Sequence, residues 1–449
     1  MSVEPQRALN PPSVSLLQAF WFWLKLGLIS FGGPAGQISI MHQELVERRR
    51  WISERRFLHA LNYCMLLPGP EAQQLAIYIG WLLHRTWGGV IAGVLFVLPS
   101  LFILIGLSWL YVAYGDVSVV VGLFYGIKPA VTAIVLHAAH RIGTRTLKNN
   151  WLWAIAGASF VAIFALKLPF PLIVLGAAVI GYLGGRFAPS QFSLGGGHGP
   201  VSQSFGPALI DDDTPSPEHA RFRWSRLTLL LMVGAGLWLL PMAALIGLFG
   251  WQGTLTQMAW FFSKAALLTF GGAYAVLPYV YQGAVDHYAW LTPTQMIDGL
   301  ALGETTPGPL IMVVAFVGFV GGYVQQVFGP EQAFMAGALA ATLVTWFTFL
   351  PSFIFILAGG PLVESTHNQL KFTAPLTAIT AAVVGVIVNL ALFFGYHVFW
   401  PTGFSGNVDL PSAVIAAIAA IALFRYKRGV IQVLLGCALA GLLVHGLRG

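Results

Sequence analysis

Long apolar stretches separated by short polar connections run through most of this 449-residue chain. Many of them approach or exceed the ~20 apolar residues with which a helix crosses a membrane, and they lack the alternation of half-buried strands. The pattern predicts helical segments at roughly 16–33, 57–83, 87–113, 117–139, 151–166, 170–185, 227–249, 254–276, 294–322, 333–358, 370–395, 411–424 and 429–447. We therefore expect an all-α polytopic membrane protein.

Two of these segments contain a Pro-Gly-Pro sequence, one at Pro68, Gly69 and Pro70 and the other at Pro307, Gly308 and Pro309. Each proline lacks an amide donor and crowds the preceding turn, so the helix must break there. In hydrocarbon such a break survives only within protein or beside a watery cavity, because its freed backbone groups need partners. A helix that restarts after the break points free N–H groups into that cavity, which suits an anion. The motifs predict an oxyanion transporter.

The chain contains an internal repeat at a constant offset of 239 positions. The matched positions are Lys25 with Lys264, the Phe-Gly-Gly of Phe31, Gly32 and Gly33 with that of Phe270, Gly271 and Gly272, Trp51 with Trp290, and the two Pro-Gly-Pro sequences. The second copy then gains 13 residues, after which Leu98-Pro99-Ser100 matches Leu350-Pro351-Ser352. Chance does not produce such an ordered series, so we expect two homologous halves.

Residues 186–226 separate the copies and are rich in Gly, Ser, Pro and charged residues, which is typical of a solvated linker. We expect an N-terminal tail at 1–15, a first transporter repeat at 16–185, this linker, a helix at 227–249 and a second transporter repeat at 250–449. The helix at 227–249 has no counterpart in the first copy. It reverses the direction in which the second copy enters the membrane, so the halves are expected to be inverted.

Basic residues support this inversion. The loop before the first Pro-Gly-Pro contains Arg48, Arg49, Arg50, Arg55 and Arg56, whereas its counterpart at 281–295 contains none. Because basic loops face the cytoplasm, the two loops are expected on opposite sides. Full crossings by every segment would place the five arginines outside, against the other basic loops, so we expect the motif segments to be re-entrant hairpins. Residues 57–67 span about 16 Å as a helix, which places the breaks near the membrane midplane.

The composition excludes several other classes of protein. The chain is 57% hydrophobic and 9% charged, far too apolar for a soluble globule. Its net charge of +7 comes from short loops and indicates orientation and contact with membrane lipid, so no nucleic-acid partner is expected. Cys64 and Cys437 lie in apolar runs and suggest neither a disulfide nor a metal site. We expect no cofactor and no removable signal peptide.

The glycines of the Phe-Gly-Gly motifs would let the backbone approach a ligand and present consecutive N–H groups to an anion, although membrane helices also use small residues merely to pack. Lys25 and Lys264 precede these motifs by about two turns. A buried lysine costs about 2.5–3.5 kcal/mol on insertion scales, and the pair would attract a divalent oxyanion. The alternative is that each lysine reaches the interface or pairs with a carboxylate.

Polar residues flank both breaks. Glu71 follows Pro70 in the first turn of the returning helix, where the helix dipole stabilises a carboxylate even without a function. Glu304 precedes the second break, and a buried, unpaired carboxyl can carry a proton, as can Glu71. Gln73 and Thr306, with their neighbours Gln74 and Thr305, would bind substrate oxygens or satisfy the broken backbone. The five arginines are either an orientation signal that anchors to anionic lipid or a funnel for cytoplasmic anions.

At these residues the chain resembles the long, two-domain members of the chromate ion transporter family. The resemblance rests on Phe-Gly-Gly-Pro, a basic loop with a Trp, and Leu-Pro-Gly-Pro, with Phe-Gly-Gly and Pro-Gly-Pro repeated in the second half. It marks as substrate-binding Phe31, Gly32, Gly33, Pro34, Pro68, Gly69 and Pro70, with Phe270, Gly271, Gly272, Pro307, Gly308 and Pro309. It implies efflux of chromate, with sulfate as an anion of the same shape, across a bacterial inner membrane, and so chromate resistance.

The second copy departs from the motif, because Ala273 replaces the proline after Phe-Gly-Gly and Leu310 stands where the first copy has Glu71. The two halves are therefore not expected to contribute equally. A sulfate importer and a passive anion channel are the alternatives, because a binding fold does not state its driving force; a homodimer is also left open. Ser159 fits Gly-x-Ser but has no partnered His, so we expect no enzymatic activity.

Overall fold

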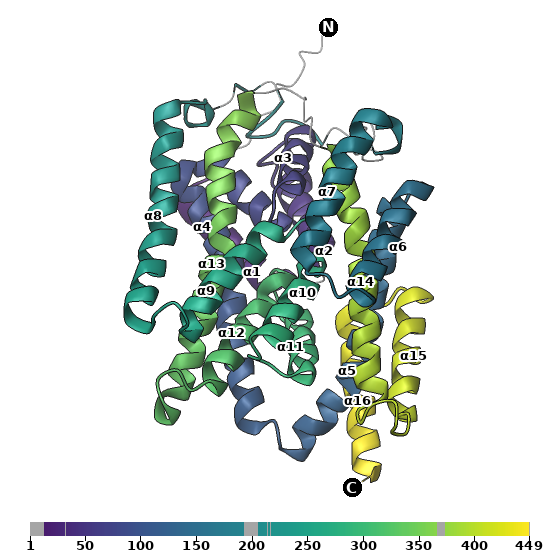
Figure 1. The fold of residues 1–449 in the computed structure, drawn as a ribbon. Coiled ribbons are helices and arrows are strands. Elements are labelled where there is room, and N and C mark those ends of the chain that lie inside the picture. The colour runs from purple at the N-terminus through teal and green to yellow at the C-terminus, as the bar shows by residue number, and fades with distance from the viewer. Residues whose placement is uncertain are drawn as a thin grey trace, which may run out of the picture.

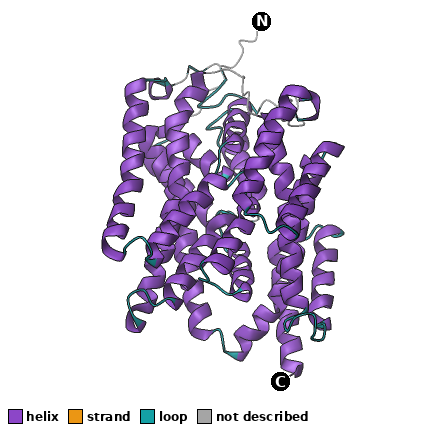
Figure 2. Cartoon of the chain, in the orientation of Figure 1, coloured by secondary structure: helices purple, strands orange, loops and turns teal. Residues whose placement is uncertain are grey.

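The computed structural model describes residues 13–31, 33–192, 205–212, 214–215, 217–365 and 373–448. These residues fold into sixteen α-helices joined by short loops and by short π-helical and 3-10 segments (Figure 2). They contain no strand, and their only β-type pairing is an isolated bridge between Ile52 and Ile210. The all-α prediction is confirmed.

The helices follow the chain as the apolar pattern predicts. Those of the first half are α1 (Leu16–Ile29), α2 (Gly33–His42), α3 (Glu54–Leu66), α4 (Glu71–Tyr114), α5 (Ser118–Thr146), α6 (Asn150–Phe164) and α7 (Phe170–Phe187). They are followed by α8 (Trp224–Phe249), α9 (Thr254–Leu268), α10 (Ala273–Tyr281), α11 (Pro293–Thr305), α12 (Val313–Val324), α13 (Ala333–Ser365), α14 (Thr373–Phe399), α15 (Leu410–Phe424) and α16 (Val430–Arg448). Seven helical stretches are long and apolar enough to cross a membrane, so the chain is a multi-pass membrane protein.

Both motifs interrupt helices where the sequence predicts. Helix α3 ends at Leu66 and α4 begins at Glu71, with Gly69 at a φ of 127° between them. In the second half, Gly308 has a φ of 106° between α11 and the 3-10 turn that leads into α12. Side-chain-bearing residues rarely adopt such values, which explains why glycine stands between the prolines.

The repeat extends to irregular details of the backbone. A π-helical turn occupies Gln43–Arg48 in the first half and Gln282–His287 in the second, at the offset of 239. The next matched pair of N-caps, Ser53 and Thr292, each accept a hydrogen bond from a backbone N–H three residues later. Sequence identity is low in these loops, so the shared geometry supports the homology of the two halves independently of the motifs.

Helix α4 is two helices joined at a sharp kink, where His84 and Arg85 have non-helical backbone angles. Residues 71–83 return from the first break, and residues 86–114 then run through the molecule in one long helix. Figure 1 shows α2 and α3 in the upper half of the molecule and their counterparts α10 and α11 in the lower half. This placement supports the prediction of inverted halves with hairpins that meet between them.

The described part of the linker is docked on the first half rather than wholly solvated. Backbone hydrogen bonds join residues 209–210 to the loop at 50–53, and the Ser53 hydroxyl donates to Asp212 at 2.6 Å. Ile210 and Ala220 are buried. The linker therefore covers the arginine-bearing loop. The sequence did not predict this contact, because isolated apolar residues in a polar stretch form no periodic pattern.

Candidate functional site

The four breaks meet through a reciprocal pair of backbone hydrogen bonds. The Gly69 N–H donates to the Thr269 carbonyl oxygen at 2.7 Å, and the Gly308 N–H donates to the Ser30 carbonyl oxygen at 2.8 Å. Thr269 is the counterpart of Ser30, one position before Phe-Gly-Gly. Each Pro-Gly-Pro break is thus bonded to the Phe-Gly-Gly break of the other half, and the two halves satisfy each other's interrupted backbone.

Two glutamines complete these connections. The Gln37 side-chain amide donates to the carbonyl oxygens of Ser30, at 3.3 Å, and Gly308, at 2.5 Å. The Gln74 amide donates to the Pro68 carbonyl oxygen at 2.8 Å and to Ser352 Oγ at 3.3 Å. Both glutamines are fully buried. They hold the Pro-Gly-Pro turns in shape where a continuous helix would otherwise use those carbonyl groups.

The two central glycines face serines of the opposite half. A Cβ atom on Gly69 would lie 2.6 Å from Ser352 Oγ, and one on Gly308 would lie 2.8 Å from Ser100 Cβ. Ser100 and Ser352 are the matched serines of the Leu-Pro-Ser sequences. Any larger residue would therefore displace a long helix of the other half as well as strain its own backbone.

Several buried polar atoms around the breaks have no hydrogen-bond partner among the described residues. They are Ser30 Oγ, Gln37 Oε1, both amide atoms of Gln73, Gln74 Oε1 and Ser100 Oγ. Buried polar groups in folded proteins are nearly always paired, so a cluster of exceptions indicates a place for a polar ligand or water. The cluster lies in the interior, between the two halves.

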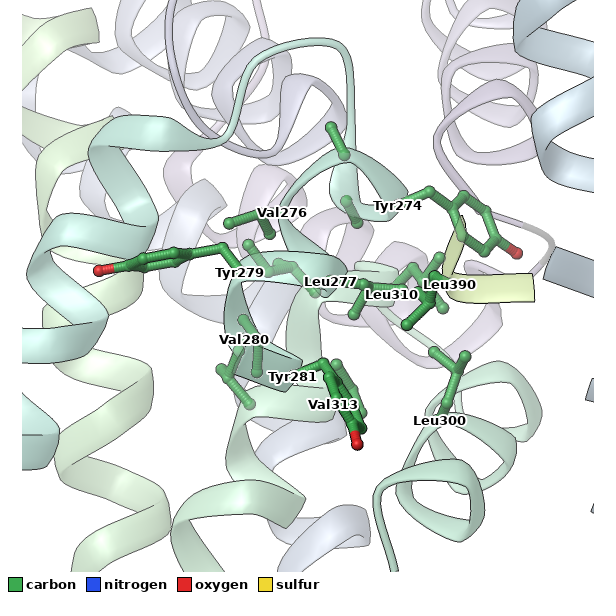
Figure 3. Packing of buried hydrophobic residues seen from close by; sticks show 14 of the residues in the cluster. Tyr274, Val276, Leu277, Tyr279, Val280, Tyr281, Leu300, Leu310, Val313 and Leu390 are labelled. Atoms are coloured by element: carbon green, nitrogen blue, oxygen red, sulfur yellow. The ribbon is translucent and has the colours of Figure 1, made fainter. Parts of the chain in front are cut away.

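The polar groups are distributed unequally between the halves. The counterparts of Gln37, Glu71 and Gln74 are Val276, Leu310 and Val313, and Figure 3 shows these three among apolar side chains around α10. The second half instead places polar groups before its break. Its buried Glu304 accepts a hydrogen bond from the Tyr274 hydroxyl. The expectation that the halves contribute unequally stays a prediction about function, but its structural basis is present.

The other predicted residues are placed as follows. Glu71 is partly exposed at the first residue of α4, and the Thr306 hydroxyl donates to the Gly303 carbonyl oxygen at 3.1 Å, so it satisfies its own helix end. The Phe-Gly-Gly residues and Pro34 are partly exposed, except that Gly32 lies outside the described residues. Lys25 is exposed on α1, whereas Lys264 is half-buried with Nζ 5.5 Å from the Trp260 ring centroid. The structure therefore joins the Pro-Gly-Pro and Phe-Gly-Gly breaks of the two halves, and it buries Gln73 fully while leaving Lys25 exposed and Lys264 half-buried.

Comparison with known proteins identifies the relatives of this fold. A sequence model described as chromate transporter matches residues 17–182 and 256–442, one match in each half. A chromate transport protein of Pseudomonas aeruginosa is 32% identical across 100% of this chain and 98% of its own length. The chain belongs to the chromate transporter family. Another family member, a chromate transport protein of Cupriavidus metallidurans, is 27% identical over 97% of this chain and 95% of its own. No solved structure matches this chain.

A relative of about half this length also matches the chain. An uncharacterised transporter of Bacillus subtilis, YwrA, is 28% identical over 174 residues, which are 38% of this chain but 96% of that protein. The matched length is close to that of one repeat, in agreement with the internal repeat. Membership in the chromate transporter family also points to a transporter rather than an enzyme.

Two charged groups that sequence analysis did not assign tie the motif hairpins to long helices. Asp298 on α11 is buried, accepts from the Tyr111 hydroxyl at 2.8 Å and lies 3.6 Å from Lys128 Nζ. In the second group, Arg56 on α3 forms an ion pair with Glu364 on α13 at 3.5 Å, and Glu364 also accepts a hydrogen bond from the Tyr78 hydroxyl. In each of these interactions the two partners are more than 150 positions apart in the chain, so sequence periodicity gives no signal for them.

The arginine-bearing loop is largely paired within the protein. Glu44 accepts hydrogen bonds from Arg48 at 2.6 Å and from Arg49 at 3.3 Å. Partial burial raises the pKa of Glu44, but the hydrogen bonds and charges of the two arginines outweigh it and lower the pKa overall. These contacts favour a structural and orienting role for the loop over a funnel for anions.

Proposed function

We propose that this protein is a secondary transporter that exports chromate from the cytoplasm across a bacterial inner membrane and so confers resistance to chromate. One structural observation carries the proposal: two interrupted helix pairs meet in the interior, bonded reciprocally through Gly69 and Gly308, beside buried polar groups that lack partners. The names of the full-length relatives supply the chemical identity of the anion. Sulfate, which has the same shape and charge, is the second substrate of the proposal.

The proposed binding region contains the Phe-Gly-Gly and Pro-Gly-Pro residues of both halves, together with Gln73. The restarting helices that follow the breaks direct free N–H groups and positive dipole ends inward, which stabilises an anion without a fixed cation. Gln73 is fully buried, and neither of its amide atoms has a partner among the described residues. Its amide N–H groups are available to substrate oxygens. Lys25, which is exposed, and Lys264, which is half-buried, attract the divalent anion towards the paired breaks.

The direction of transport follows from the membrane potential. Each charge moved across 100 mV is worth about 2.3 kcal/mol, so an inside-negative potential drives a dianion outward with about 4.6 kcal/mol. Uniport is therefore sufficient for efflux. Proton coupling is needed only against gradients beyond that limit, and in that case Glu71 and Glu304, which flank the two breaks, are the proposed proton carriers.

Transport by purified protein in proteoliposomes tests this proposal. We expect chromate to accumulate on the side made positive by a potassium–valinomycin potential, sulfate to compete, and an imposed pH gradient alone to produce little transport. Glu304→Gln is expected to alter the pH dependence if protons are coupled. Accumulation of neither oxyanion, with the protein folded and correctly inserted, would exclude the proposed function. Accumulation on the negative side would favour import of sulfate.

A further inference from the structure

The two reciprocal breaks differ in whether their hydroxyl groups are already engaged. Around Gly69, the Thr269 hydroxyl donates to the Ala265 carbonyl oxygen at 2.7 Å, and Ser352 Oγ receives the Gln74 amide. Around Gly308, the counterpart hydroxyls of Ser30 and Ser100 are both fully buried, and neither has a partner among the described residues. The two sets are related by the repeat, so the difference is specific to the Gly308 side.

Ser100 is one of a few buried helical hydroxyls without a partner among the described residues, with Ser108 and Thr256, and of these three it is the one that packs against Gly308. Hydroxyl groups in apolar helices normally donate to the carbonyl group four residues earlier, as Thr345 and Thr348 on α13 do at 2.7 Å each. Ser100 lies on α4 with the same option towards residue 96 but does not use it. Its hydroxyl therefore remains free to donate to a group outside its own helix.

Two of the unpartnered atoms near Gly308, the hydroxyl oxygens of Ser30 and Ser100, belong to groups that can donate to an anion, whereas the unpartnered Gln37 Oε1 can only accept. Gln37 Nε2 is occupied by two carbonyl oxygens, so it acts as a positioning residue that fixes the Ser30 and Gly308 backbone. The Ser30 and Ser100 hydroxyls are neutral donors, and both residues contact Gly308. Ser30 accepts the Gly308 N–H through its carbonyl oxygen, and a Cβ on Gly308 would lie 3.1 Å from Ser100 Oγ. Neutral donors bind a tetrahedral dianion without the strong ion pairing that would slow its release.

We propose that Ser30 and Ser100 form an oxyanion subsite at the Gly308 break, in which both hydroxyl groups donate to oxygens of a tetrahedral dianion such as chromate or sulfate. The subsite rests on the proposed function and adds to Gln73 two further residues that bind the anion through their side chains. It also distinguishes the two breaks by their hydroxyl groups, which are unengaged at Gly308 in Ser30 and Ser100 but hydrogen-bonded at Gly69 in Thr269 and Ser352.

Initial rates of chromate and sulfate uptake into proteoliposomes test the subsite in Ser30→Ala, Ser100→Ala and the double variant. Each single replacement is expected to raise KM roughly 10- to 100-fold, the effect of removing a hydrogen bond to a charged group, with a smaller change in kcat. Thr345→Val, which removes a buried hydroxyl satisfied within its own helix, is the matched control and should retain the KM of the unmodified protein.

Thermal unfolding of the same purified variants separates binding from structure. Removing a hydroxyl without a partner should leave Tm unchanged or higher, while the stabilisation of the protein by added chromate should be lost. A lower Tm without chromate, failure to accumulate in the membrane, or an unchanged KM would overturn the subsite, and the last result would assign the hydroxyls to buried water. Transport by the unmodified protein with normal KM in the variants refutes only the subsite, whereas no transport by the unmodified protein refutes the proposed function.

Discussion

At the scale of single residues, the structure depends on glycines and short polar side chains rather than on charges. Gly69 and Gly308 adopt left-handed backbone angles and approach the long helices of the opposite half. Only a residue without a side chain meets both conditions at once. The Pro-Gly-Pro sequence therefore reports two separate requirements: prolines stop the helix, and the glycine permits the turn and the contact.

Replacing Gly69 or Gly308 with leucine should abolish transport. The side chain would collide with Gln74 and Ser352 in the first case and with Ser100 in the second, and the left-handed backbone adds about 1–2 kcal/mol of strain. Transport and membrane abundance measured in parallel provide the test. Gly106→Ala, at an α4 position with open space around it, is the control and should behave as the unmodified protein. A Gly69→Leu protein that accumulates normally and still transports chromate would remove the break from the mechanism.

At the scale of elements, the apolar pattern predicts most helices within a few residues, because spans of uniform hydrophobicity have one stable form in hydrocarbon. The breaks at the two motifs also follow from local chemistry. The kink at His84 and Arg85 lies between the predicted segments 57–83 and 87–113, so the apolar pattern indicates its position although neither residue is a helix breaker. The contacts of Gln37, Ser100 and Ser352 are absent from sequence reasoning, because they join segments that only the packed fold brings together.

The Asp298 group offers a test of how the hairpin of α11 is held. Lys128→Ala should lower stability by about 1–3 kcal/mol, because it leaves a buried carboxylate without its cation; the partial exposure of Lys128 limits the effect. Adding Asp298→Asn should recover part of the loss. Thermal unfolding in detergent would measure both, with the exposed Lys148→Ala as control, where we expect a change within ~0.5 kcal/mol. Equal stability of the Lys128→Ala and unmodified proteins would show that Tyr111 alone holds the carboxylate.

At the scale of the whole molecule, the halves repeat in sequence, in irregular backbone features and in their contacts. Reciprocal bonding between Pro-Gly-Pro and Phe-Gly-Gly segments requires the halves to face each other across the interior. The two halves have related backbones, but the unequal distribution of their polar residues leaves one polar region between them. The duplication is visible in the sequence. The difference in polarity between matched positions can be interpreted only in the structure, which shows which residues surround each break.

Inverted topology predicts that matched positions react on opposite sides of the membrane. Glu47 and Asp286 are matched at the offset of 239, and both are exposed. In a background with Cys64 and Cys437 replaced, Glu47→Cys should react with a membrane-impermeant maleimide only after the cytoplasmic side is exposed, and Asp286→Cys should react in intact cells. Labelling of both from one side would refute the inverted arrangement.

The reciprocal hydrogen bonds of Gly69 and Gly308 also constrain how the protein is made. When the ribosome has released only the first half, the Gly69 N–H still lacks its partner, the Thr269 carbonyl oxygen, and the Ser30 carbonyl oxygen lacks the Gly308 N–H. Each half supplies hydrogen-bond partners for the interrupted backbone of the other. We therefore expect the hairpins of the first half to reach their final position in the membrane only after about 240 more residues have been inserted. Until the second half is inserted, the unpaired backbone groups of the first half therefore need a polar environment that is shielded from lipid.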